Sequence, residues 1–185
     1  MIFNGEMVRA ILDGGKTQTR RPVKVPHIDK DAMCELSGNE LAGELLAGNY
    51  RNSPHGKPGD RIWVRETWAR YNIDQDSHDM AYRATPPADW PEEGRWRPSI
   101  HMPRWASRLM LEITGVRVER LQAITLGDIC KEIGCGLYDF RPATYGFQVW
   151  EELWKSIYGE ENWQANPWVW VIEFKVVPNV QDNPA

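Results

Sequence analysis

The chain has 185 residues, 42% of them hydrophobic and 26% charged, which is typical of one soluble globular domain with its own core. Its formal net charge of −4 argues against a protein that coats nucleic acid non-specifically, because such binding depends on neutralising many phosphates. No segment approaches the roughly 18 consecutive apolar residues of a membrane span, and the amino terminus does not resemble a signal peptide.

The first part of the chain predicts a short helix followed by an extended segment. Within residues 3–13, Phe3, Met7 and Ile11 recur at helical spacing, and the pair of glycines that follows ends the helix. Residues 16–23 are expected to be extended, because a residue that precedes proline is disfavoured in the helical conformation. Residues 25–57 have mixed polarity and many turn signals, which indicates an insertion.

The middle of the chain predicts a hairpin and a long loop. Residues 61–71 alternate in the period-two pattern of a strand, and residues 79–85 are the predicted hairpin partner. Residues 85–105 are rich in proline and tryptophan and have little periodicity, so we expect a long ordered loop of the kind that often has a function.

The last part predicts two strands and two helices. Residues 107–124 form a strand with a bulge at Gly115, and Thr125 caps a short helix that ends near residue 134. Residues 144–159 are predicted to form a longer helix, and residues 166–177 the final strand, with Val169, Val171 and Phe174 buried. The aromatic and aliphatic stripe of the longer helix is expected in the core; it comprises Phe147, Trp150, Trp154 and Ile157.

The order of these elements indicates an α+β fold, in the form of a small, partly closed β-barrel with flanking short helices. Strand–helix–strand alternation is missing, which argues against a doubly wound sheet. We expect a single domain over residues 1–178, with the insertion at 25–57 and the loop at 85–105, and a frayed tail at 179–185.

Charge is segregated along the sequence. Residues 14–24 hold four cations and no acid, and residues 51–70 are rich in arginine, whereas residues 29–44 are acidic. This pattern predicts a local positive cleft on an acidic body.

The segment "GGKTQTRR" contains Lys16, Thr19 and Arg21, which are candidates for a site that handles an anionic or polar ligand. A desolvated lysine with a lowered pKa can accept the proton of a threonine hydroxyl and so activate it, whereas a protonated lysine can only bind an anion. A carboxylate such as Glu66, at the end of "KPGDRIWVRE", could transfer the proton to a leaving amine. The alternative is a polar turn, with Glu66 in an ion pair with Arg21 or Arg65.

These motifs resemble the ASCH domain family of the PUA-like superfamily, and above all its phage and prophage members. The resemblance rests on "GGKTQTRR" and "KPGDRIWVRETW", and it extends to "IHMPRW", "LEITGVRVERLQ" and "NPWVWVIEF". It implies a PUA-like barrel whose cleft binds RNA or a nucleotide-like ligand. Some small members are amidohydrolases that deacetylate N4-acetylcytidine with a Lys, a Thr and a Glu, which correspond here to Lys16, Thr19 and Glu66; another member is described as a ribonuclease.

Other side chains are candidates for ligand binding. Arg21 and Arg65 have the geometry to hold a phosphate, and Trp63 and Trp68 can stack on a base or lie in the core. His101, in the proline-rich loop, is either a ligand residue or a structural one.

Three functions therefore remain open. The first is a module that binds RNA or a modified nucleotide or nucleoside; the second is an amidohydrolase acting on N4-acetylcytidine-like nucleosides. The third is an accessory or morphogenetic phage protein that acts through protein contacts. We expect no cofactor or metal, because no Cys or His spacing resembles a zinc site. We also expect no membrane partner, and a location in the cytoplasm of a bacterial host.

Overall fold

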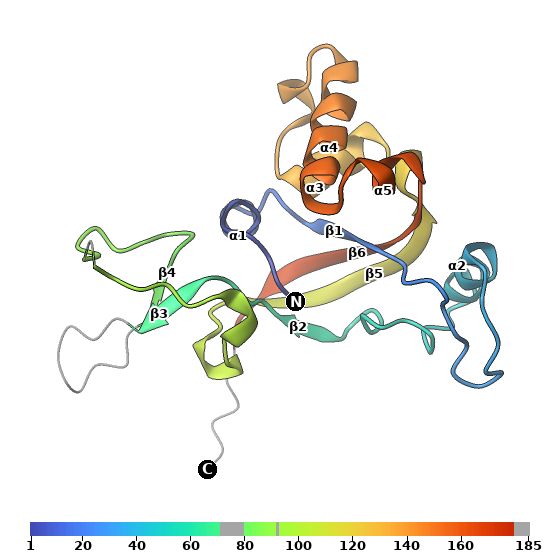
Figure 1. Ribbon diagram of the computed structural model, residues 1–185, viewed down its shortest axis with the longest axis horizontal. Coiled ribbons are helices and arrows are strands. Elements are labelled where there is room, and N and C mark those ends of the chain that lie inside the picture. Colours follow the sequence, from blue (N-terminus) through green and yellow to red (C-terminus); the bar gives the residue numbers. More distant parts are fainter. Residues whose placement is uncertain (71–79, 92, 180–185) are drawn as a thin grey trace.

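A computed structural model describes residues 1–70, 80–91 and 93–179 of the chain, which form an α+β protein. Its main element is a curled antiparallel sheet that resembles half a barrel (Figure 1). The strand order is β1 (Gln18–Pro22), β6 (Trp168–Val177), β5 (Met110–Arg120) and β2 (Arg61–Trp63). A separate hairpin pairs β3 (Trp68–Arg70) with β4 (Met80–Tyr82), as expected for residues 79–85.

Helices surround this sheet (Figure 1). On one side lie α3 (Leu126–Ile133), α4 (Ala143–Tyr158) and the short α5 (Glu160–Gln164); α1 (Gly5–Leu12) lies near the start of β1, and α2 (Gly38–Leu46) lies near one end. Short 3-10 turns occupy Ser99–His101, Arg104–Ala106, Leu121–Ala123 and Leu137–Asp139. No helix among the described residues is long and apolar enough to cross a membrane.

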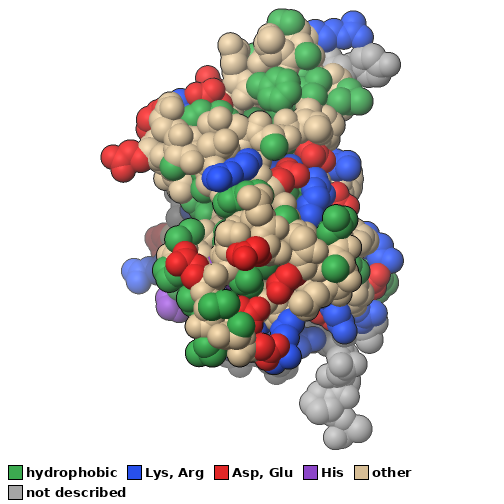
Figure 2. Space-filling model, turned by 90° about the vertical axis from the view of Figure 1, so that its right-hand side faces the viewer, with side chains coloured by type: hydrophobic (Ala, Val, Ile, Leu, Met, Phe, Trp, Pro, Cys, Tyr) green, Lys and Arg blue, Asp and Glu red, His purple; other side chains and the backbone are tan. Residues whose placement is uncertain are grey.

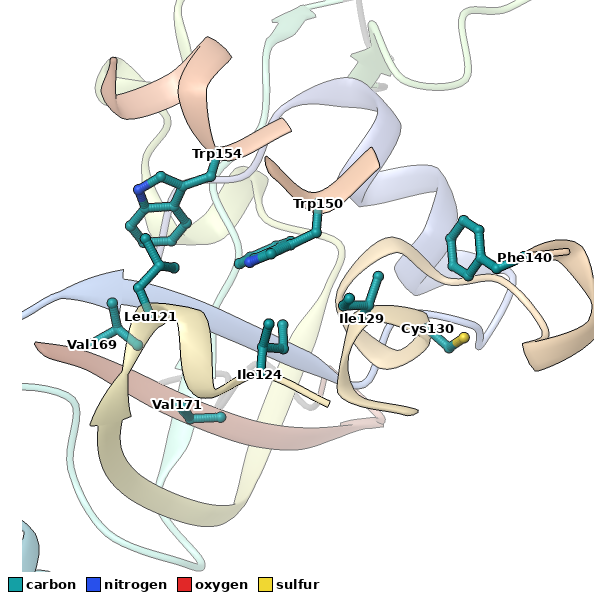
Figure 3. Close-up of a cluster of buried hydrophobic side chains, with 9 residues drawn as sticks. All are labelled: Leu121, Ile124, Ile129, Cys130, Phe140, Trp150, Trp154, Val169 and Val171. Carbon is teal, nitrogen blue, oxygen red and sulfur yellow. The ribbon is translucent and has the colours of Figure 1, made fainter. Parts of the chain in front are cut away.

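The sheet is buried on both faces, because alternate residues of β6 contact different sets of helices. Val169 and Val171 face α3 and α4, where they contact Trp150 and Trp154 in the hydrophobic cluster of Figure 3. Trp170 lies on the opposite face, in a second cluster that is closed by residues of α2. Since residues directly opposite in an antiparallel pair share a face, the pairing of Arg21 with Trp170 places both on this second face.

Several predictions from local sequence signals are confirmed. The helix after Phe3 is α1, the register of β5 shifts between Ile113 and Gly115, and Thr125 caps α3 by accepting a hydrogen bond from the Asp128 amide at 3.2 Å. In the proposed loop at 85–105, the described residues include a 3-10 turn at Ser99–His101 and the start of another at Arg104–Ala106, and none of them belongs to an α-helix. The helix α2, inside the expected insertion, was not predicted, although Ser37 and Glu40 form a capping box at its start.

Two predictions were wrong. Residues 61–71 do not form one strand, because the chain leaves the main sheet after Trp63 and enters the hairpin at Trp68. The stripe of α4 is only half buried. Trp150 and Trp154 lie in the core, but Phe147 and Ile157 are 43% and 45% exposed, since the helix covers the sheet with only one edge of the stripe.

Surface chemistry differs between the two ends of the molecule. Figure 2, which shows the side that carries α2, has acidic side chains scattered around this helix and hydrophobic side chains gathered at the end formed by α3, α4 and their connection. The exposed hydrophobic residues of that end include Leu137, Tyr145 and Phe147.

Candidate functional site

Two glycines direct Lys16 towards α3. Gly14 has a φ of +75°, which reverses the chain after α1, and a Cβ on Gly15 would lie 2.6 Å from the carbonyl oxygen of Gly134. The chain can therefore approach the end of α3 closely only with glycine at position 15. Thr17 then donates its backbone N–H to the carbonyl of Lys131, which fixes this approach.

The side chain of Lys16 is 2% exposed and is held by α3. Its Nζ donates to the carbonyl oxygens of Gln18 at 2.8 Å and Glu132 at 2.5 Å, and it lies 3.2 Å from the Glu132 carboxylate. Burial lowers the pKa of Lys16, while the carboxylate of Glu132 opposes this effect. These three contacts of the ammonium join the start of β1 to α3.

Arg20 extends this buried network on the same face of the sheet. Its guanidinium lies within 3.4 Å of three carboxylates, those of Glu119, Asp128 and Glu132. Two of the three, Glu119 and Asp128, also bind Arg117. The cations on this face are thus matched by carboxylates and leave no excess charge for a ligand.

Thr19 and Glu66 do not line the same cavity. Thr19 is buried beside a small void of about 20 Å³ between β1 and α4. Glu66 is 2% exposed, lines a different cavity near the start of α1, and accepts two hydrogen bonds from Arg108, at 2.8 and 2.9 Å. Glu66 is therefore in an ion pair, as one alternative had it, but with Arg108 rather than with Arg21 or Arg65. The catalytic roles of Lys16, Thr19 and Glu66 stay a prediction.

The remaining predicted ligand residues are dispersed. Trp68 is buried in a small cluster with Met102, so its ring is part of the core. Trp63 is half-buried and lies under the guanidinium of Arg65, with 4.9 Å between the Cζ atom and the ring centroid. His101 is exposed in a 3-10 turn.

A cleft of about 800 Å³ lies on the Trp170 face of the sheet. It is lined by apolar side chains and by five basic ones, which come from β1 and the residues after it, from the segment after β2 and from the insertion. The described lining residues are Met1, Ile2, Arg21, Pro22, Lys24, His27, Pro54, His55, Ile62, Arg65 and Trp170. None of these is an aspartate or glutamate, so the described wall of the cleft is positively charged.

The first residues of the chain position the two arginines of this cleft. Ile2 pairs in parallel with Arg65, whose backbone N–H donates to the Met1 carbonyl at 2.7 Å. Arg21 donates from Nη2 to the Ile2 carbonyl at 2.8 Å, and its Cζ lies 5.4 Å from the centroid of the Phe3 ring. The first residues therefore hold the guanidinium of Arg21 and the backbone of Arg65, while Nη1 of Arg65 donates to the Ile100 carbonyl at 3.3 Å.

Two histidines of the insertion contact the same tryptophan. The rings of His27 and His55 each lie 5.7 Å from Trp170, edge to face, and His27 Nε2 lies 3.1 Å from the carbonyl oxygen of Asn52. Burial lowers the pKa of His55 to about 4, with a further contribution from the charge of Arg21. The pKa of His55 thus responds to the positive potential of the cleft.

The cations of the cleft have unused bonding capacity. Among the described residues, Arg21, Lys24 and Arg65 form no ion pair, and the buried Nε of Arg65 has no hydrogen-bond partner. Three cations without a carboxylate partner among the described residues suit a site that an anion completes. The arrangement can bind an anionic group beside a flat or apolar one.

Sequence reasoning identified Arg21 and Arg65 but missed the other side chains of the cleft. Lys24 belongs to the cation-rich segment 14–24, which was a usable signal. His27, His55 and Trp170 gave none, because they come together only when the insertion folds over β6.

No family model matches this sequence, and no curated protein is similar to it. The chain has a likeness to the crystal structure of a protein from Enterococcus faecalis that is described by the family model DUF984. The TM-score is 0.43 at 10% sequence identity, over 97% of this chain and 75% of that chain. A likeness at this level assigns neither a family nor a function to the chain.

Proposed function

We propose that this protein is an ASCH-type, PUA-like domain that binds RNA or a modified nucleotide or nucleoside in the cleft on the Trp170 face. The observation that carries the proposal is the convergence of Arg21, Lys24 and Arg65 on a cleft of about 800 Å³ whose described lining holds no carboxylate. The motif resemblance and the curled antiparallel sheet with flanking helices are consistent with it.

The chemistry of the cleft suits both halves of a nucleotide. Guanidinium groups bind phosphate oxygens through charge-assisted hydrogen bonds, which are about twice as strong as neutral ones. The imidazole rings of His27 and His55, with Ile62 and Pro54, offer flat and apolar surface to a base. Trp170 itself is 1% exposed, so it supports the imidazoles rather than stacking on the ligand directly.

The amidohydrolase alternative receives less support. The lowered pKa of Lys16 suits a base. However, the ammonium of Lys16 is held by Glu132, and the carboxylate of Glu66 is held by Arg108, on the side of a different cavity. Binding in the cleft is therefore the function that we propose.

The test is equilibrium binding of a short labelled single-stranded RNA, followed by fluorescence anisotropy at several salt concentrations. Each phosphate contact lowers log K by about 0.7 per unit of log salt, so engagement of two or three cations predicts a slope of roughly −1.4 to −2. Arg21→Gln and Arg65→Gln should each weaken binding by about 10-fold or more, since hydrogen bonds to charged groups contribute about 1.5–3 kcal/mol.

Lys175→Gln is the matched control, because it removes one positive charge from an exposed position of β6 outside the cleft. It should change affinity by less than about 2-fold. No binding of RNA or nucleotides by the wild type, or an equal loss in the control and in the arginine variants, would refute the proposal.

A further inference from the structure

The cations of the cleft converge from two strands onto one volume. Arg21 lies on β1, Lys24 follows this strand, and Arg65 follows β2 on the far side of Ile2. The number of these cations indicates how much negative charge the ligand carries. Three full positive charges line the cleft with no described carboxylate beside them, whereas the Arg20 side of the same strand is fully matched by acids.

The positive charge of the cleft favours a terminal phosphate monoester over an internal phosphodiester. An internal phosphodiester of RNA carries one negative charge, whereas a terminal phosphate monoester carries about −1.5 to −2 at neutral pH and offers three acceptor oxygens. A diester would leave most of the positive charge of the cleft uncompensated. A monoester neutralises more of it and offers one more acceptor oxygen to the lysine and arginine side chains that line the cleft.

We propose, on the basis of the function proposed above, that the cleft selects nucleotides and RNA ends that carry a terminal phosphate monoester. Arg21, Lys24 and Arg65 bind the phosphate, and His27 and His55 lie beside the base or sugar. This assigns a ligand class to a site whose lysine, Lys24, is exposed and whose two histidines pack against Trp170.

The cleft also sets a limit on the rest of the ligand. Its volume of about 800 Å³ falls within the roughly 300–1,000 Å³ of pockets that enclose small molecules, so one nucleotide unit fits inside it. The apolar part of the wall, with Ile62, Pro54 and Ile2, is unsuited to a second phosphate. A single monophosphate unit therefore satisfies both the charge and the volume of the cleft.

The experiment is isothermal titration calorimetry of the full chain at pH 7.5 with four matched probes. These are cytidine 5′-monophosphate, its methyl ester, cytidine and inorganic phosphate. The monoester should bind at least about 10-fold more tightly than the methyl ester, and both cytidine and inorganic phosphate should bind more weakly still. A second pair of probes, a short RNA with a 5′-phosphate and the same RNA with a 5′-hydroxyl, tests whether an RNA end serves as the source.

Single substitutions show which side chains cause the preference for the monoester over its methyl ester. Lys24→Gln removes an exposed side chain with no described bond, so the fold should survive, and the preference for the monoester over its methyl ester should fall several-fold. Arg65→Gln should reduce the preference for the monoester more than Lys24→Gln does. Lys175→Gln should leave it unchanged.

The outcomes are distinguishable. If the methyl ester binds as tightly as the monoester, the inference is wrong, but nucleotide binding in the cleft stands. If inorganic phosphate binds as tightly as cytidine 5′-monophosphate, the cleft is a simple anion site and the inference is also wrong. If no probe binds and RNA does not bind either, both this inference and the proposed function fail.

Discussion

Arg20 and Arg21 are adjacent in β1, yet their guanidinium groups lie in opposite electrostatic environments. Arg20 is enclosed by carboxylates of α3 and β5 and is 3% exposed. Arg21 lines the cleft, donates to the Ile2 carbonyl at 2.8 Å and to the Tyr158 hydroxyl at 3.5 Å, and forms no ion pair with any described residue. The period-two geometry of a strand thus divides one cation-rich motif into a structural half and a half available to a ligand.

The stability of the protein should depend on the buried ammonium of Lys16. Lys16→Met leaves the buried carboxylate of Glu132 with Arg20 as its main partner, and breaking a buried pair typically costs about 3–5 kcal/mol. We expect a loss of about 3 kcal/mol in the free energy of unfolding, measured by urea denaturation. The double variant Lys16→Met/Glu132→Gln should be less destabilised than the sum of its single variants.

The same variant also tests the catalytic alternative. Lys16→Met should retain nucleotide affinity, because Lys16 does not line the cleft. If instead Lys16→Met is as stable as wild type, and the wild type but not the variant releases cytidine from N4-acetylcytidine, Lys16 is a catalytic residue and the structural assignment is wrong.

Glu66 and Arg108 form an ion pair outside this network, with the carboxylate buried and the guanidinium partly exposed. Arg108→Gln leaves a carboxylate that is 2% exposed without its bidentate partner, so we expect a loss of about 3 kcal/mol or more in the free energy of unfolding. Glu66→Gln keeps the shape of the side chain and leaves the more exposed arginine unpaired, so its cost should be smaller. Equal stability of Arg108→Gln and wild type would show that the pair is not formed.

His55 predicts a dependence of stability on pH. Its pKa is lowered from 6.5 to about 4 in the folded state, so the unfolded chain binds more protons at this site between these values. The stability contributed by neutral His55 is fully present above pH 6.5, is lost as the pH falls towards 4, and changes no further below it. Because the ring is partly exposed, we expect a loss of only about 1 kcal/mol between pH 7 and pH 5.

The control for this prediction is His55→Gln, which cannot titrate. Urea denaturation at pH 5, 6 and 7 should give a flatter profile for the variant than for the wild type. Parallel profiles would mean that the pKa of His55 is close to its ordinary value, and that its ring is less buried than the structure shows.

The two halves of the α4 stripe should respond differently to truncation. Trp150→Ala removes a buried ring and should cost about 3–5 kcal/mol, whereas Phe147→Ala removes a side chain that is 43% exposed and should cost less than about 1 kcal/mol. Thermal denaturation monitored by circular dichroism distinguishes the two. Similar losses for both variants would support the original expectation that the whole stripe lies in the core.

Local sequence signals predicted most of the elements correctly. The glycines after α1, the bulge at Gly115 and the Thr125 cap each depend on a few neighbouring residues, and all three are present in the structure. The split of residues 61–71 between two sheets was missed, because alternation of side chains continues through a change of partner strand. Which strand a segment pairs with depends on distant residues.

The contacts within the candidate site were even harder to predict, because they join residues that are distant in the sequence. The motif predicted that Arg21 and Arg65 bind a ligand, and both line the cleft. The partners of Lys16 and Glu66 lie 116 and 42 residues away in the sequence, and no spacing rule links them. The contacts of His27 and His55 with Trp170 are equally remote, because the insertion must fold over β6 before they form.

The most direct test of the central claim is a titration of the isotope-labelled protein with cytidine 5′-monophosphate, followed by two-dimensional NMR of backbone amides and indole N–H groups. We predict that the shifts concentrate on the lining of the cleft, at Arg21, Lys24, His55 and the indole of Trp170, and that Arg21→Gln weakens them while Lys175→Gln does not. Shifts centred elsewhere, such as around Glu66 or on α4, or no shifts at millimolar ligand, would contradict the claim that this cleft is the binding site.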